Sequence, residues 1–354
     1  MTSSYAIIRK ALNIVVVLFM IVYAVITLLP FYMIFVRSFV STREASRFHF
    51  WIPPAEDVNL DADIGNLSVF YSLDLRQVKR DLGIPETDYL NPRMTLKELS
   101  VEYAIPEARM QQYFRPFIRY NGWIVLVRHP QFLGALGRTT LLTVVGLIGM
   151  NLLSMLTGSG LAGFRHRYQM SIYNLYLVET ALPIMLILVP QFMVLQSLAR
   201  WLAPGYDLGG PNRMAGQLGM LLLLYVRGGP LQTMIYTAFI STIPQELEDA
   251  AAIDGASRWQ YIWRVQGPLM KIPAASVTMA VLPGLWNDFL QPFVYLDMKN
   301  TTLLPLIQGF AGEYSTNFQV IYAGICVSIL PLVLIFVLFR RYFVMAQLSG
   351  AVKG

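Results

Sequence analysis

The sequence predicts an all-α polytopic membrane protein with six transmembrane helices and a small helical extracytoplasmic insertion after the first span. Three observations lead there. Of the 354 residues, 55% are hydrophobic and only 14% are charged, against about 25% charged in soluble domains. Uncharged runs long enough to cross a bilayer recur along the chain. A polar island, residues 243–273, separates two of those runs.

Six runs with little or no charge can cross the ~30 Å hydrocarbon core as helices. They are residues 11–36, 139–164, 180–199, 214–243, 272–288 and 315–339. Arg227 interrupts the fourth run, and Asp288 closes the fifth. The first run is too long for a signal-peptide core and lacks a small-residue cleavage site, so we expect a retained span.

Basic residues flank three of these runs on the side that the positive-inside rule assigns to the cytoplasm. They are Arg9 and Lys10 before the first run, Arg165 and Arg167 after the second, and Arg340 and Arg341 after the sixth. We therefore expect both termini and the polar island in the cytoplasm. The single cysteine, Cys326, lies within the sixth run, which excludes an intrachain disulfide framework.

This topology divides the chain into three parts. Residues 1–40 hold the N-terminus and first span, residues 41–133 form the extracytoplasmic helical insertion, and residues 134–354 hold the other five spans. Between residues 43 and 128 there are eleven Lys/Arg and twelve Asp/Glu, so the insertion is nearly neutral. Because a structureless segment of about a hundred residues would be unusual, we expect the insertion to fold.

An internal repeat predicts helices in this insertion. Residues 75–86 align with residues 96–107 at an offset of 21, and each copy places apolar residues at i, i+3 and i+7 before Ile-Pro-Glu. This spacing indicates helix–turn–helix units in which Ile-Pro-Glu ends one helix and starts the next. The neutral charge argues against binding to DNA. A structural role and a docking surface for a solute-binding protein remain open.

The polar island predicts two short helices joined by a sharp turn. Pro244 suits a first helical turn, and the acidic residues after it complement the helix dipole. A run of three alanines, which are strong helix formers, comes next. Gly255 breaks the helix, and Ser257 can cap a second one. Bounded by Pro268 and Pro273, the two helices form a small-residue knob suited to a partner's groove.

This stretch resembles the cytoplasmic coupling loop of ABC-importer permeases. The family pattern is Glu-Ala-Ala, three residues, Gly, nine residues, then Ile-x-Leu-Pro. The sequence here reads Asp249-Ala250-Ala251, then Gly255, then Val265-Gln266-Gly267-Pro268. Asp for Glu and Val for Ile keep charge and shape, whereas Gly267 removes an apolar contact.

The variant Ile-Pro-x-Glu-Leu-Glu-x-Ala-Ala-x-Ile-Asp-Gly-Ala-Ser is typical of the carbohydrate-uptake branch of that family. So are Trp286-Asn287-Asp288-Phe289-Leu290 and the C-terminal tail, residues 350–354. The resemblance covers about residues 5–40 and 130–354, so the insertion lies outside it.

The resemblance implies a permease subunit in the cell membrane of a bacterium or archaeon, forming half of a translocation pathway for a sugar, an oligosaccharide above all. It implies a heterodimer with a second permease, a dimer of ATPase subunits and an extracytoplasmic solute-binding protein. The residues that would couple to the ATPase are Glu248, Asp249, Ala250, Ala251, Asp254, Gly255 and Pro268. The tail would also reach the ATPase pair.

Catalytic motifs are missing from the sequence. It contains no Walker A sequence, metalloprotease motif, Cys/His metal spacing or nucleophile elbow. The three histidines, His49, His129 and His166, are scattered. We therefore expect no enzyme activity, cofactor or metal site, and ATP hydrolysis by a separate subunit. Residues 158–163 read GxGxxG, but no strand precedes them, so close helix packing is the better interpretation.

Two charges fall inside expected spans and are candidates for the translocation pathway. Glu179 and Arg227 both lie about 18–20 Å from a membrane face, near the midplane. A structural pair, lining of a solute cavity, and a misplaced boundary or snorkelling side chain are the three interpretations. Residues 228–230, Gly-Gly-Pro, should kink the span. Further candidates for the pathway are Tyr225, Trp286 and Asn287.

Other classes of protein fit less well. An ABC importer permease for a non-sugar solute would carry the same loop. A secondary transporter would need no coupling knob and would often show an inverted repeat. A membrane-bound glycan synthase would need a carboxylate cluster. A sensor or scaffold would leave the cytoplasmic motif unexplained. Copurification with an ATPase separates an importer from the last three.

Overall fold

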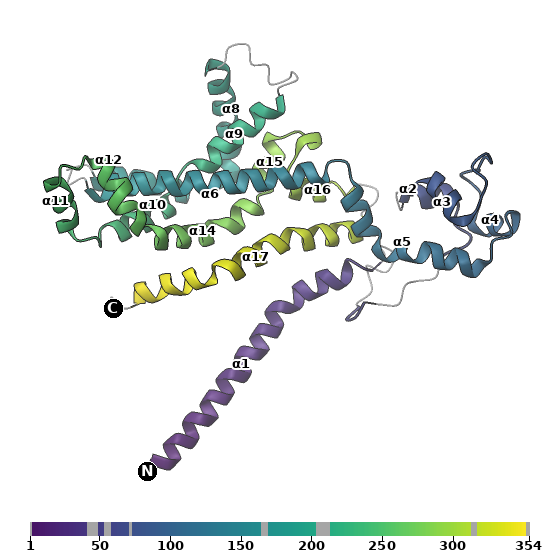
Figure 1. The fold of residues 1–354 in the computed structure, drawn as a ribbon, viewed down its shortest axis with the longest axis horizontal. Coiled ribbons are helices and arrows are strands. Elements are labelled where there is room, and N and C mark those ends of the chain that lie inside the picture. The colour runs from purple at the N-terminus through teal and green to yellow at the C-terminus, as the bar shows by residue number, and fades with distance from the viewer. Residues whose placement is uncertain are drawn as a thin grey trace. The chain divides into compact units, whose positions relative to one another are not determined.

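The computed structural model describes residues 2–40, 49–52, 58–70, 73–163, 169–202, 213–312 and 317–351. Regular structure in these ranges is helical, apart from one isolated bridge between Asp63 and Thr95. The chain forms two compact units, Met1–His129 with Ile307–Val327 and Pro130–Leu306 with Ser328–Gly354. Figure 1 shows the helices in chain order by colour. The prediction of an all-α chain is confirmed for the described residues.

Three helical segments are long and apolar enough to cross a membrane: Leu12–Arg37, Phe132–Ala162 and Phe318–Leu338. Two bent helix pairs would raise the total to five. They are Gly216–Val226 with Pro230–Ile240, bent by 40°, and Arg258–Leu269 with Lys271–Trp286, bent by 69°. The chain is therefore a multi-pass helical membrane protein with three to five candidate spans among its described residues, and the number six stays a prediction.

In the first unit, α1 (Thr2–Arg37) is followed by four helices that share a hydrophobic core. These helices are α2 (Ile64–Phe70), α3 (Leu75–Leu82), α4 (Leu96–Glu102) and α5 (Glu107–Arg128). Their fully buried side chains include Ile64, Leu96, Leu99, Met110 and Phe114. Residues 58–118 thus carry a core of their own, as the helical pattern of the repeat predicts.

The repeat is visible in the backbone as well. Gly83 and Ala104, which are equivalent at the offset of 21, both adopt a positive φ, 78° and 49°. Each follows a short helix whose end is closed by the next residue, with Ile84 N–H bonded to Lys79 O and Ile105 N–H to Ser100 O. In both copies, the residue after the helix adopts the left-handed backbone conformation that glycine favours.

One part of the repeat prediction is wrong. The second Ile-Pro-Glu starts a helix, because Pro106 precedes α5 directly. The first does not, because Pro85 leads into a turn closed by a bond from Asp88 N–H to Pro85 O at 3.2 Å. A proline permits a helix start without enforcing one, so the sequence pattern alone did not distinguish the two copies.

The end of α1, the second half of α5 and the start of α17 (Phe318–Ala351) meet through polar contacts within the first unit. Arg37 donates to the Tyr322 hydroxyl at 3.1 Å, and Trp123 Nε1 donates to Ser38 Oγ at 3.2 Å. The buried Gln319 amide donates to the carbonyl oxygens of residues 118 and 119 on α5. These bonds satisfy polar groups that would otherwise be costly in an apolar interior.

The second unit is built around α6 (Phe132–Gly163), which packs against α9 (Arg213–Val226), α10 (Pro230–Ile240) and α14 (Lys271–Trp286). Figure 1 shows α6 running alongside α10 and α14. Gly158 permits the close approach to α10, because a Cβ there would lie 2.9 Å from Tyr236 Cβ. The helix-packing interpretation of the GxGxxG stretch is confirmed at this position.

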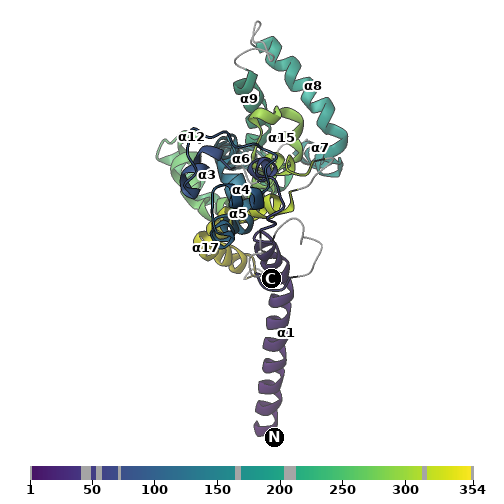
Figure 2. The same cartoon turned by 90° about the vertical axis from the view of Figure 1, so that its right-hand side faces the viewer.

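The third expected span is interrupted. Instead of one helix over 180–199, the chain forms α7 (Gln169–Ala181) and α8 (Ile184–Leu202), with a break at Leu182 and Pro183. The residue before a proline avoids the helical region, which accounts for the break. Helix α8 packs against α9, and Figure 2 shows the two side by side.

After α14 the chain continues through short elements: α15 (Leu290–Tyr295), the 3-10 turn η3 (Met298–Asn300) and α16 (Leu303–Gln308). Helix α17 follows and contains the sixth expected span from residue 318 onwards. Several expected features fall outside the described residues. These are the basic residues Arg165 and Arg167, His166, and the tail from residue 352.

Candidate functional site

The first half of the polar island is an exposed helix. Helix α11 (Gln245–Ile253) begins after Pro244 and carries Glu246 and Glu248 in its first turn, where they complement the dipole. None of its residues is buried. The helix ends at Gly255, whose φ of 78° allows the chain to turn back. The Ala256 N–H closes this end on Ala251 O at 2.9 Å. The predicted helix and turn are confirmed.

The second half is a second helical segment, Arg258–Leu269. Ser257 caps α12 (Arg258–Tyr261) through a reciprocal pair of bonds with Gln260, as the sequence predicts. The helix then widens into the π-helix η2 (Ile262–Gln266) and continues as α13 (Gly267–Leu269). Pro268 lies in α13, and the helix ends one residue later at Leu269, so the boundary that Pro268 predicts is displaced by a single residue.

The second half is anchored, in contrast to α11. Its buried side chains join one apolar cluster with side chains from α6, α10 and α14. The buried members of this base cluster are Met155, Tyr236, Tyr261, Ile262, Met270 and Val277. The polar island is therefore an exposed helix, α11, followed by a base, residues 258–270, that is buried on one side.

Several large apolar side chains of the island remain exposed on the isolated chain. Ile253 is 86% exposed and Trp259 is 61% exposed, and Leu247 and Trp263 are also exposed. Single exposed apolar residues are ordinary, but four within seventeen positions of a short polar segment are characteristic of a surface that a partner covers.

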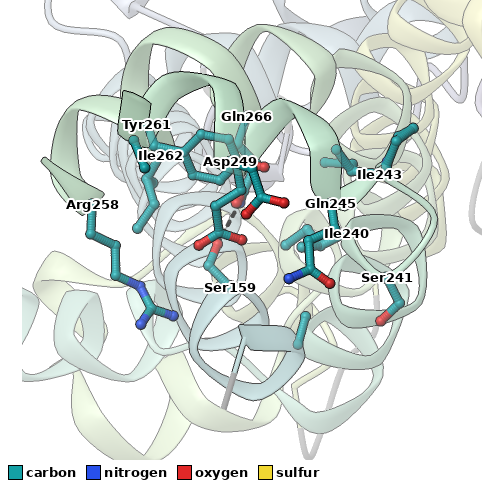
Figure 3. Close-up of a pocket in the computed structure, with 14 residues that line it drawn as sticks. Ser159, Ile240, Ser241, Ile243, Gln245, Asp249, Arg258, Tyr261, Ile262 and Gln266 are labelled. Carbon is teal, nitrogen blue, oxygen red and sulfur yellow. Dashed lines mark hydrogen bonds between the residues drawn. The ribbon is translucent and has the colours of Figure 1, made fainter. Parts of the chain in front are cut away.

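A cleft of about 630 Å³ opens between α11, the base and the end of α6. Figure 3 shows its lining, with Asp249 from α11 and Arg258 from α12 among the labelled side chains. Glu248 also lines it, so two of the three acidic residues of the predicted coupling set border the cleft, and Asp254 does not. At its floor the buried Gln266 amide donates to Ser159 Oγ on α6.

The structure places six of the seven predicted coupling residues on α11 or the turn after it. Glu248, Asp249, Ala250, Asp254 and Gly255 are exposed, and Ala251 packs partly against the base cluster. Pro268 is exposed on α13, separated from the other six by the whole of α12 and η2. The first six form one continuous surface segment.

The two charges predicted within spans are an ion pair. Glu179 on α7 contacts Arg227, which lies at the break between α9 and α10. One helical turn before Glu179, the Tyr176 hydroxyl donates to the Gly228 carbonyl oxygen. Helix α7 thus provides a partner for the Arg227 side chain and a hydrogen-bond donor for the Gly228 carbonyl at the break. The side chains of Arg227 and Glu179 are 46% and 28% exposed on this chain.

The other three candidates for the pathway are placed differently. Tyr225 and Trp286 are buried, and each has a hydrogen-bond acceptor within the second unit. The Tyr225 hydroxyl donates to Asp288 Oδ2 at 2.6 Å, and Trp286 Nε1 donates to Ser328 O at 2.9 Å. Of the three, only Asn287 is exposed. Hydropathy did not predict the role of Asp288 as the acceptor for Tyr225.

Among the residues with described structure, no group of three or more His, Cys, Asp or Glu side chains could hold a metal ion.

Comparison with known proteins identifies similar chains. Permease protein AmyC of Thermoanaerobacterium thermosulfurigenes, named for a probable transport system for starch degradation products, is 28% identical over 222 residues, covering 62% of this chain and 75% of AmyC. Melibiose/raffinose/stachyose import permease protein MelC of Bacillus subtilis is 37% identical over 127 residues, covering 35% of this chain and 46% of MelC. Lactose transport system permease protein LacG of Rhizobium radiobacter is 28% identical over 221 residues, covering 60% and 72%.

A solved structure shares the fold. A chain of a bacterial ABC transporter involved in the import of the acidic polysaccharide alginate superposes with a TM-score of 0.61 at 15% identity, over 94% of this chain and 97% of that one. Residues 131–346, more than half of the chain, match the family described as binding-protein-dependent transport system inner membrane component. The protein belongs to this family of ABC transporter permeases, whose members span the membrane while a separate subunit hydrolyses ATP.

Proposed function

We propose that this chain is the permease subunit of an ATP-driven, binding-protein-dependent importer of sugars, with an oligosaccharide as the solute, and that residues 243–273 couple it to the ATPase. The observation that carries the proposal is the contrast within that loop. Helix α11 has no buried residue and exposes Ile253, whereas the following base packs buried side chains against three helices of the second unit. An exposed helix attached to a packed base is suited to bind a partner and to transmit the partner's movement.

The mechanism follows from this construction. An ATPase that changes shape when it binds ATP would carry α11 with it, and the base would pass the movement to α10 and α14. The pathway would then switch between outward-facing and inward-facing states. ATP can shift this equilibrium only by the difference in its affinity for the two states. Asp249 and Glu248 offer charges for the interface, and Ala250 allows close approach.

The proposed solute is supported by the relatives. AmyC, MelC and LacG are named for starch degradation products, for melibiose, raffinose and stachyose, and for lactose. All are carbohydrates, and most are oligosaccharides. An importer of another solute class would use the same loop and is the alternative. A secondary transporter or membrane scaffold would leave the exposed α11 without a role.

The proposed assembly contains this chain, a second permease, two ATPase subunits and an extracytoplasmic binding protein. We propose six spans with both termini and the coupling loop in the cytoplasm, which divides the chain into residues 1–40, 41–133 and 134–354. ATP would be bound by the ATPase subunits, and this chain would need no cofactor. The hydrophobic core of residues 58–118 supports a folded insertion outside the membrane, available to dock the binding protein.

For the solute pathway, exposure favours three of the five candidates. Glu179, Arg227 and Asn287 offer polar groups at the surface of this chain, where a second permease would face them. Tyr225 and Trp286 are enclosed and support the packing behind that surface. We therefore propose that the first three line the pathway and that the last two position them.

Purification of the tagged chain from native membranes tests this function. The proposal expects an ATPase and a second permease to copurify, and a binding protein to associate when solute is present. In proteoliposomes the complex should take up the sugar bound by that protein only with ATP inside. The binding protein is then titrated with mono- and oligosaccharides, amino acids and inorganic phosphate. Tight binding of a non-sugar would favour the alternative, and uptake without any ATPase would overturn the proposal.

A further inference from the structure

One polar contact links the coupling loop to α6. The Gln266 side-chain amide, at the end of η2, donates to Ser159 Oγ, and Ser159 in turn donates to Met155 O at 2.7 Å. A serine hydroxyl has one hydrogen, so the bond to Met155 leaves its oxygen to accept from Gln266. Both residues are buried, with exposures of 2% for Gln266 and 5% for Ser159. The contact is thus directional, and its two side chains have little exposed surface at the floor of the cleft.

The position of this contact determines what it can do. Helix α11 has no buried residue, so movement imposed on it passes into the second unit through the base and through its direct link to α10, residues 241–244. The apolar part of the base is non-directional, since burial of apolar groups depends mainly on area. A hydrogen bond fixes distance and angle. Gln266 and Ser159 therefore fix the position of the base along α6.

The π-helix accounts for the placement of Gln266. In η2 the Gly267 N–H bonds to Ile262 O, a wider turn than the α-helical one. One extra residue in a turn rotates the next part of the helix by about 100° relative to an uninterrupted α-helix. The turn thus determines whether the amide of Gln266 faces α6. Gly267 also fits here, because a Cβ at this position would lie only 3.2 Å from Ile262 O.

We propose that the Gln266–Ser159 hydrogen bond is a positioning contact that makes the coupling loop and α6 move as one body when the ATPase changes state. The proposal rests on the coupling function proposed above. Ser159 belongs to the GxGxxG stretch, so this stretch provides both close helix packing at Gly158 and an attachment point for the loop.

The test is a distance measurement within the assembled transporter. Spin labels are placed at Ala252 on α11 and at Val144 on the exposed face of α6, in a Cys326→Ser background. Distances are recorded without nucleotide and with ATP under conditions that prevent hydrolysis. The decisive variant is the double substitution Gln266→Leu with Ser159→Ala. Replacing both partners by apolar groups can leave stability nearly unchanged, whereas either single change leaves one buried group unpaired.

The wild type should give the same Ala252–Val144 distance in both states. With ATP, the double variant should show a second Ala252–Val144 distance. The fraction of molecules at this second distance should be about fivefold larger than in the wild type, because the net contribution of one hydrogen bond corresponds to about that factor. The matched control is Tyr236→Phe, which removes a bond between α10 and α6 in the same base cluster, from Tyr236 to Asn151 at 2.8 Å, without changing a residue of the loop. The control should keep the wild-type distance.

The outcomes separate the two proposals. An unchanged distance in the double variant, with the ATPase still bound, overturns the positioning role alone. An equal shift in Tyr236→Phe also overturns it, because any lost bond would then loosen the loop. Failure of the ATPase to copurify with the wild type overturns the proposed function and this inference with it.

Discussion

Glu179 on α7 forms an ion pair with Arg227 at the break between α9 and α10. Tyr176, one turn earlier, donates to the Gly228 carbonyl that the same break leaves free. An interrupted helix in a membrane needs its backbone groups satisfied by neighbours, and α7 supplies that partner. The kink between α9 and α10 and the Glu179–Arg227 ion pair are thus both supported by contacts with α7.

This arrangement predicts non-additive effects of substitution. Glu179→Gln and Arg227→Gln should each destabilise the assembly, by an amount between about 1 kcal/mol for an exposed pair and about 3–5 kcal/mol for a buried one, since both side chains are partly exposed. The double variant should recover most of that loss. Thermal unfolding of the three purified variants measures it. Losses that simply add would show that the pair contributes nothing.

The same variants test the role in the pathway. If the charges line the solute pathway, the double variant should be stable yet take up solute poorly. If they are only structural, its uptake should follow its stability. The matched control is Tyr176→Phe, which removes the neighbouring bond to Gly228 without changing charge, at a cost of about 1 kcal/mol.

The repeat in the insertion predicts opposite effects at its two helix ends. Ala104 holds a φ of 49° where the equivalent residue is Gly83. A left-handed conformation costs a non-glycine residue about 1–2 kcal/mol, and the extra freedom of glycine in the unfolded chain offsets about 0.4–1 kcal/mol. Ala104→Gly should therefore slow hydrogen exchange in α4, and Gly83→Ala should speed it in α3. Faster exchange in α4 of Ala104→Gly would contradict the assignment.

The proposed topology predicts the labelling of two single cysteines. Thr87 lies in the exposed turn between α3 and α4, and Ala252 lies on the exposed α11. In a Cys326→Ser background, an impermeant maleimide added to intact cells should label Thr87→Cys but not Ala252→Cys. Lysed cells serve as the control, in which both should react. The reverse pattern in intact cells would invert the topology.

The parts of the fold that could be predicted are those set by local chemistry. Gly255, Ser257 and the kink after Arg227 lie where turn, cap and helix-breaking residues predict them. The repeat predicted buried faces at Val78 and Leu99, because helical periodicity reports which side of a helix packs. The position of the exposed helix α11 followed from the same signals.

What could not be predicted depends on tertiary packing. The π-helix at residues 262–266 has no signal in the local composition, yet it sets which way Gln266 faces. Tyr225 and Trp286 were candidates for the pathway because of their chemistry, yet both are enclosed. Hydropathy cannot tell which face of an apolar helix meets its neighbours. The Gln266–Ser159 bond spans 107 residues and lies beyond any local pattern.

The central claim is that the loop with α11 couples this permease to an ATPase. It is tested most directly by ATP-driven solute uptake into proteoliposomes that contain the complete transporter with Gly255→Trp in this chain. Gly255 has a φ of 78°, so a bulky side chain would strain the turn that presents α11. Deletion of residues 249–255 is the companion variant. Uptake should fall steeply while membrane insertion persists. Normal uptake by Gly255→Trp with the ATPase still assembled would contradict the account.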